Sequence, residues 1–166
     1  MEDLNDKDTG HVLRRLPVDL FQLGLAIRED EFTREQLEYI PLFDIETGEI
    51  VTLWKHSESL DWITEGGWRN REEWEKQQQI RQGIGKRYVE IPYTSHAEAH
   101  MLLEGFLDSL NSEEVEEAVT HVKGIGNTLL ELQQFGIEKW QWNNYMQEYA
   151  EDFARDWLRD LGIESP

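Results

Sequence analysis

The spacing of apolar residues changes along this chain from strand-like to helix-like. Residues 39–54 place apolar and β-branched side chains on both sides of a turn, ETG, in which Gly48 supplies the positive φ of a short hairpin loop. A further run of strand-forming residues, 87–91, ends at Pro92, which has no N–H to donate. We therefore predict a three-stranded antiparallel meander. Pro41 predicts that its strand is an edge strand or bulged, because a central strand would miss the proline N–H.

Two short helical segments are predicted before this sheet. Apolar residues at helical spacing in residues 20–27 predict a first helix, with Asp19 near its start, where the helix dipole favours a carboxylate. Thr33 and Gln36 have the spacing of a capping box and predict one more helical turn.

The segment 55–86, between the hairpin and the third strand, is irregular and rich in tryptophan. Its spacing of Trp residues matches neither a helix nor a strand. Asn70 and Glu73 predict the start of a helix that runs to about Gln82 and has little apolar face. We expect this helix either to pack by its ends or to be exposed for a partner.

Beyond Pro92 the apolar residues keep a helical period. Ser95 and Glu98 form a capping box, in which the hydroxyl accepts an N–H of the first turn and the carboxylate reaches back to the cap. The helix that follows has one apolar face, made of Ala99, Leu102, Leu103, Phe106 and Leu110.

Three more helices are predicted to the end of the chain. Asn111 with Glu114 predicts the start of the first, residues 128–135 form the second, and residues 138–161 form the last. The long helix carries an apolar stripe made of Trp142, Met146, Tyr149, Phe153, Trp157 and Leu161. The sequence therefore predicts a single α+β domain, residues 16–163, in which about four C-terminal helices pack on the meander, preceded by a loose acidic arm, residues 1–15.

Charge narrows the classes of partner. The chain of 166 residues has 35 acidic and 16 basic side chains, a formal net charge of −19, which predicts repulsion of nucleic acid and anionic membranes and attraction of basic proteins. The alternative is that the acidic balance only gives solubility. It has no Cys, no basic-then-apolar signal segment and no apolar run long enough to span a bilayer. We expect a cytoplasmic protein.

Three stretches together resemble a known family. FDIETGEI, RYVEIPYTSHAEAHMLLEGF and the ending FARDWLRDLGI are similar in order and spacing to uncharacterised protein family 0158 of bacteria, over about residues 16–163. The segment 55–86 is longer and richer in Trp than is usual there. The resemblance implies an α+β bacterial cytoplasmic protein, and it brings no activity, catalytic residue or cofactor.

Acidic rows suggest a first function, binding of a basic protein such as a nuclease or nucleic-acid-binding protein. A row of carboxylates one helical turn apart approaches the charge spacing of a nucleic-acid strand; a solvated helix face is the alternative. The residues concerned are Glu148, Asp152, Asp156 and Asp160 on the last helix, Glu113 and Glu117 on an earlier one, and the aromatic residues Trp62, Trp68 and Trp74.

Glycine turns suggest a second function, nucleic-acid binding. Residues 122–132 locally resemble a helix-hairpin-helix, in which amides of the turn hold a phosphate; a tight connection between packed helices is the alternative. The residues concerned are Lys123, Gly124 and Gly126. A second GIG at 83–85 lies beside the cations Arg81, Lys86 and Arg87, which could hold an anion. The net charge opposes both.

A histidine row suggests a third function, a small metal-dependent enzyme. His96, His100 and Glu104 follow one another by one helical turn, as metal ligands on a helix do, although a polar helix face has the same spacing. No nucleophile, base and acid set or nucleotide-binding loop is present, so no catalytic residue and no cofactor are assigned. Our first expectation is a non-enzymatic acidic interaction protein.

Overall fold

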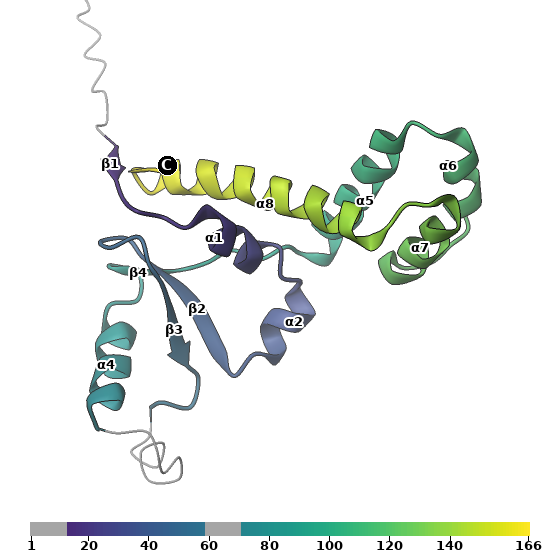
Figure 1. The fold of residues 1–166 in the computed structure, drawn as a ribbon. Helices are drawn as coiled ribbons and strands as arrows, with labels where there is room; N and C mark the ends of the chain where they lie inside the picture. The colour runs from purple at the N-terminus through teal and green to yellow at the C-terminus, as the bar shows by residue number, and fades with distance from the viewer. Residues whose placement is uncertain (1–12, 59–70) are drawn as a thin grey trace, which may run out of the picture.

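The computed structural model describes residues 13–58 and 71–166, and this part of the chain is α+β (Figure 1). It contains seven α-helices, a three-stranded antiparallel sheet and a small parallel pair of strands. In chain order the elements are β1 (Arg14–Arg15), α1 (Leu20–Ile27), α2 (Glu31–Gln36), β2 (Tyr39–Asp44), β3 (Ile50–Trp54), α4 (Arg71–Gln82), β4 (Tyr88–Glu90), α5 (His96–Leu110), α6 (Glu113–Val119), α7 (Ile125–Leu132), the 3₁₀ turn η1 (Gln133–Phe135), α8 (Lys139–Asp160) and β5 (Ile163–Glu164).

The sheet has the strand order β3-β2-β4, with β2 antiparallel to both neighbours. The predicted hairpin is therefore present, and Gly48 has φ 81° in its loop. The prediction of a meander is wrong, because the third strand pairs with the first arm of the hairpin and not with the second. The prediction for Pro41 is wrong for the same reason, since its strand is the central one.

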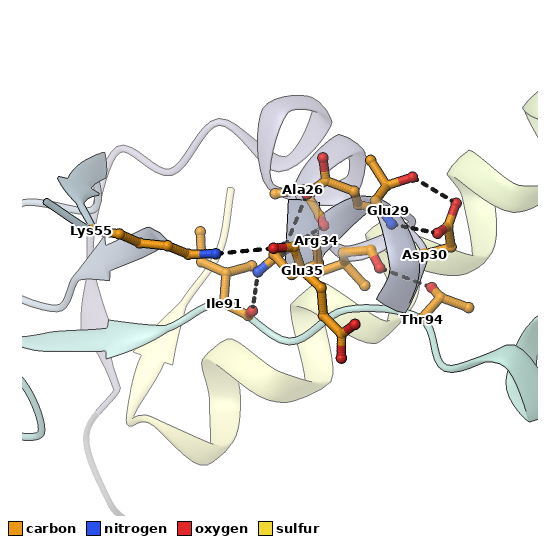
Figure 2. A network of polar contacts seen from close by, with 10 residues as sticks. Ala26, Glu29, Asp30, Arg34, Glu35, Lys55, Ile91 and Thr94 are labelled. Carbon is orange, nitrogen blue, oxygen red and sulfur yellow. Dashed lines mark hydrogen bonds and ion pairs between the residues drawn. The ribbon is translucent and has the colours of Figure 1, made fainter. Parts of the chain in front are cut away.

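Arg34 explains how Pro41 is tolerated in the central strand. On the β4 side, Ile91 N–H donates to the Pro41 carbonyl at 3.4 Å. The return bond of this antiparallel pair would run from residue 41 to the Ile91 carbonyl, and proline has no N–H to make it. The Nη1 of Arg34 donates to the Ile91 carbonyl instead, at 2.8 Å, from a side chain that is only 6% exposed (Figure 2). A guanidinium thus replaces the missing backbone donor.

The same guanidinium closes the end of α1. Its Nη2 donates to the Ala26 carbonyl at 2.6 Å, and its Nε pairs with Glu29 at 2.9 Å. The hydroxyl of Thr94 donates to the Ile27 carbonyl at 2.8 Å. The last carbonyls of a helix have no partners within the helix. Here they bind side chains that join α1, α2 and the segment after β4 into one buried junction (Figure 2).

The helix α8 runs from beside β1 past α1 to α5, and α6 and α7 lie at its N-terminal end (Figure 1). Its 22 residues span about 33 Å at 1.5 Å per residue. Its C-terminal half packs with α1 and with Phe43 of β2 in one hydrophobic cluster. Its N-terminal half packs with α5, α6 and α7 in a second cluster. A third cluster joins Leu42 and Leu53 of the sheet to Ile80 of α4 on the opposite sheet face. Four helices follow the sheet, as predicted.

The buried stripe of α8 differs from the prediction in its C-terminal half. Trp142 and Met146 are buried as expected, whereas Phe153 is 36% exposed. The buried residues there are Ala150, Ala154 and Leu158. Small side chains allow α1 to approach closely: a Cβ on its Gly24 would lie 2.6 Å from the Nε2 of Gln147.

Three of the predicted helix starts lie at other residues, and one of these is the start of α7, which begins at Ile125 and not at residue 128. The Ser95–Glu98 capping box is confirmed, with both reciprocal hydrogen bonds present. The prediction that Asn111 caps the next helix is wrong, because Asn111 ends α5 in the left-handed conformation and Ser112 is the N-cap of α6. Likewise Asp30, and not Thr33, is the N-cap of α2.

Candidate functional site

An open cleft of about 980 Å³ lies between α1, the sheet and α4. Its floor is one face of the β2–β3 hairpin, because alternate strand residues point to the same side of a sheet. Tyr39 and Pro41 of β2 lie there opposite Trp54 and Thr52 of β3. The rings of Tyr39 and Trp54 meet edge to face, with centroids 5.6 Å apart. The floor is therefore largely apolar and aromatic.

The rim of this cleft is acidic. Four carboxylates line it, and Lys76 of α4 is the one cation among its described lining residues. Asp19 is held in place as the N-cap of α1, where it accepts from Gln22 N–H at 3.0 Å. Glu29 pairs with the buried Arg34. The other two rim carboxylates are Glu49, in the hairpin loop, and Glu73, in the first turn of α4.

One wall of the cleft is the outer edge of β3. Asp44 N–H donates to the Glu49 carbonyl at 2.9 Å, which fixes the alternation of the β2–β3 ladder. Ile50, Thr52 and Trp54 consequently point their N–H and C=O groups away from β2. These groups form an edge of the kind that another strand can pair with.

A side chain from α4 covers two backbone groups of that edge. Gln77 is buried, and its amide accepts from Trp54 N–H at 2.9 Å and donates to the Thr52 carbonyl at 3.0 Å. One amide group thus makes the two bonds that a neighbouring strand would make. Within the described residues no hydrogen bond reaches the N–H or C=O of Ile50 or the N–H of Thr52. We call these three groups the open edge.

Asp44 and Arg87 hold the loop end of the hairpin. Both oxygens of the buried Asp44 accept from Arg87, at 2.7 to 3.1 Å, and Arg87 also pairs with Glu46 at 3.0 Å. Burial alone would raise the pKa of Asp44, but the hydrogen bonds from Arg87 and from Glu46 N–H outweigh it and lower the pKa below its usual value. The same contacts raise the pKa of Arg87.

The predicted acidic row on α8 is exposed and is partly neutralised. Arg155 pairs with Asp152 at 2.6 Å, and Arg159 pairs with Asp156 at 2.9 Å. No ion pair involves Glu148 or Asp160 within the described residues. The exposed Glu113 and Glu117 lie on α6, beyond the N-terminal end of α8 (Figure 1), so they do not join the row.

Of the three Trp residues in the predicted partner surface, the structure describes only Trp74. Trp74 lies on α4 and is half-buried, and its buried Nε1 has no hydrogen-bond partner among residues 13–58 and 71–166. Trp62 and Trp68 lie outside the described residues.

The two glycine turns do not form a cationic surface. Gly124, with φ 86°, is the N-cap of α7, which already includes Gly126, so the expected turn of three residues is the start of a helix. Lys123 is exposed beside it. At the second turn, Arg81 bonds Glu58, the Ser57 hydroxyl and the Trp54 carbonyl, and Arg87 is held by Asp44. Lys86 is exposed.

The histidine row is brought together only in part. The Nε2 atoms of His96 and His100 lie 3.0 Å apart on α5. The described residues hold no group of three or more His, Cys, Asp or Glu side chains that could bind a metal ion, so Glu104 does not complete a site.

No family model, no curated protein and no solved structure matches this chain. The resemblance to family 0158 stays a prediction from the sequence. In the described part of the chain no helix is both long enough and apolar enough to cross a bilayer.

Sequence reasoning missed the cleft residues as a group. The alternation of Ile50, Thr52 and Trp54 was the available signal, since it places Trp54 and Ile50 on the same face of the second arm of the hairpin. Nothing in the local sequence indicates that Gln77 reaches this strand, because 23 and 25 positions separate it from its two partners.

Proposed function

We propose that this protein is an acidic interaction module that binds a lysine- or arginine-rich segment of a partner protein in the cleft. The observation that carries the proposal is the combination of an acidic rim with an apolar, aromatic floor. Aliphatic stems of Lys and Arg pack on apolar and aromatic surfaces while their charged ends pair with carboxylates. The net charge of −19 draws such a partner in from a distance.

The cleft supports this function better than the row on α8. Two of the four carboxylates of the row already have arginine partners on the same helix. The four carboxylates of the rim include Glu29, which pairs with Arg34, but they come from four separate segments and line one concave surface. A concave surface also excludes more water from a bound side chain than a convex helix face does, which strengthens each charge pair.

Peptide binding tests the proposal. The probe is a short, capped, fluorescently labelled peptide of alternating Lys and Val, and the measurement is anisotropy at about 0.05 M and about 0.5 M ionic strength. We expect the double variant Asp19→Asn, Glu49→Gln to weaken binding about tenfold at low salt, because two rim charges are lost. Asn at position 19 keeps the helix cap. High salt should weaken binding to the native protein.

A matched variant separates the cleft from general acidity. The double variant Glu148→Gln, Asp160→Asn removes the same charge from α8, and we expect it to weaken binding by less than about twofold. An equal or larger effect of the α8 variant would assign binding to the acidic row or to net charge and would contradict the cleft. Absence of saturable binding to the native protein would overturn the proposed function.

A further inference from the structure

We infer that the cleft takes its basic segment as an added β-strand, hydrogen-bonded to the open edge of β3. This inference rests on the proposed function and specifies the conformation of the bound segment. The open edge offers Ile50 N–H, Ile50 C=O and Thr52 N–H, all on one side of the strand and all without a partner within the described residues. An antiparallel strand would use all three groups.

Gln77 limits how far an added strand can pair with β3. Its amide already fills the next two positions, the Thr52 carbonyl and the Trp54 N–H. The open edge is therefore short, and side-chain contacts must supply most of the affinity. Those contacts are available because Ile50 and Thr52 also line the acidic cleft. Alternate side chains of an added strand would point toward the α1 side, which carries Asp19 and Glu29, and toward the α4 side.

Charge identifies the occupant as a basic segment of another protein. A second copy of this chain would bring the same carboxylates against the rim and a further net charge of −19. Like charges placed opposite each other across a strand pair are destabilising. A basic extended segment has the opposite charge and an unpaired backbone.

Thr52→Pro tests the backbone bond directly. The N–H of Thr52 points away from β2, so its removal leaves the β2–β3 ladder intact, and proline is found in edge strands at positions of this kind. Thr52→Val is the matched control, because it keeps the N–H and removes only the hydroxyl. With the Lys-Val peptide we expect Thr52→Pro to weaken binding about tenfold and Thr52→Val to leave it within about twofold.

A modified probe gives a second test on the native protein. In an added strand, alternate residues direct their N–H groups to β3 and the others direct them outward. We therefore expect N-methylation of either all Lys or all Val nitrogens to abolish binding, while methylation of the other set is tolerated. Binding should also slow amide hydrogen exchange at Ile50 and Thr52, measured by NMR.

The outcomes separate the two proposals. If the rim variants weaken binding but Thr52→Pro does not, the two methylated peptides behave alike, and exchange at Ile50 and Thr52 is unchanged, the strand inference is wrong and the acidic cleft stands. If the unmodified peptide shows no saturable binding, the proposed function itself is wrong. Peptide-independent dimerisation that Thr52→Pro abolishes would identify a second copy as the occupant and overturn the basic segment.

Discussion

On both sides of the β2–β3 hairpin, backbone groups lack a partner in a neighbouring strand. Side chains from helices bind the group that Pro41 leaves unpaired on one side and only some of the groups on the other. On the β4 side, Pro41 leaves one carbonyl of the ladder without a backbone donor, and Arg34 fills that position from a buried site with three further contacts. On the outer side of β3, Gln77 fills two positions and three others stay open. The closed side is part of the core, and the open side lines the cleft.

This difference shows how helices complete a small sheet. Both Arg34 and Gln77 come from helices: Arg34 replaces the N–H that Pro41 lacks, and Gln77 replaces backbone groups of a strand that is absent beside β3. A guanidinium has five donors in a fixed plane and can hold several acceptors at once, whereas a single amide has a matched donor and acceptor for one strand edge. Where the replacement is complete the edge is part of the core, and where it is partial three backbone groups of β3 stay open.

Of the proposed variants, removal of the Arg34 guanidinium should lower the free energy of unfolding most, because the groups that Arg34 binds then lose their partner. Arg34→Met keeps much of the volume but leaves the carbonyls of Ile91 and Ala26 without this donor and Glu29 without its cation. We expect the free energy of unfolding to fall by about 3 kcal/mol, measured by urea denaturation.

Restoring the backbone donor is the control for that loss. Pro41→Val adds an N–H that faces the Ile91 carbonyl, so in the Arg34→Met background it should recover about 1 kcal/mol. In the native background the new N–H competes with Arg34 for one carbonyl and should add less. Equal effects of Pro41→Val in the two backgrounds would show that Arg34 does not act in place of the missing N–H.

Removal of the Gln77 amide should extend the open edge at a smaller cost. Gln77→Leu leaves the Thr52 carbonyl and Trp54 N–H without these hydrogen bonds, and we expect a loss of about 2 kcal/mol in urea denaturation. Gln79→Leu, at an exposed position of the same helix, should change stability by less than about 0.5 kcal/mol. A similar loss in both variants would attribute the effect to the surface of α4 and not to the edge of β3.

Asp44 should make the loop end beside the open edge sensitive to acid. A carboxyl whose pKa is lowered by folding stabilises the protein above its unfolded pKa, about 3.9, and this contribution is lost as the pH falls through the folded value. Asp44→Asn should therefore cost about 1 kcal/mol near pH 7 and progressively less below about pH 4. Urea denaturation across this range measures the trend. A constant difference, or the same trend in the exposed variant Asp108→Asn, would contradict the assignment.

Local signals predicted much of the fold. The capping box at Ser95 and the positive φ at Gly48 depend on residues within a few positions, and both are confirmed. The prediction for Asn111 is wrong because two helix ends meet there. Asn111 matches an N-cap pattern but is the C-cap of α5, and Ser112 is the N-cap of α6. Competition of this kind is not visible in a single short window.

The wrong predictions for Pro41 and for the buried stripe of α8 depend on contacts between residues that are far apart in the sequence. Pro41 is compatible with a central strand only because of Arg34, which reaches the Ile91 carbonyl across 57 positions of sequence. On α8, the search for large apolar residues favoured Phe153, while the contact with α1 is made by small ones such as Ala150 and Ala154. Two helices can pack closely only where their side chains are small, and small side chains contribute little to the hydrophobic pattern of a sequence.

The proposed class of partner is the same as the one predicted from the sequence, whereas the proposed binding surface is a different one. The net charge indicated a basic partner, and that remains the proposal. The row on α8 was chosen because four carboxylates at one spacing are conspicuous in a sequence, whereas the rim residues Asp19, Glu29, Glu49 and Glu73 come from separate segments and show no pattern.

The position of α8 also has a consequence for the protein during its synthesis. Both the cluster with α1 and the cluster with α5, α6 and α7 include residues of this helix. A ribosome makes α8 after every other helix of the described fold, so each cluster is without one wall until the half of α8 that packs on it has left the exit tunnel. The apolar surface of α1 is made first and is covered last, because the half of α8 that packs on it is the last to emerge, and a chaperone would encounter this surface for longer than the surface of α5, α6 and α7.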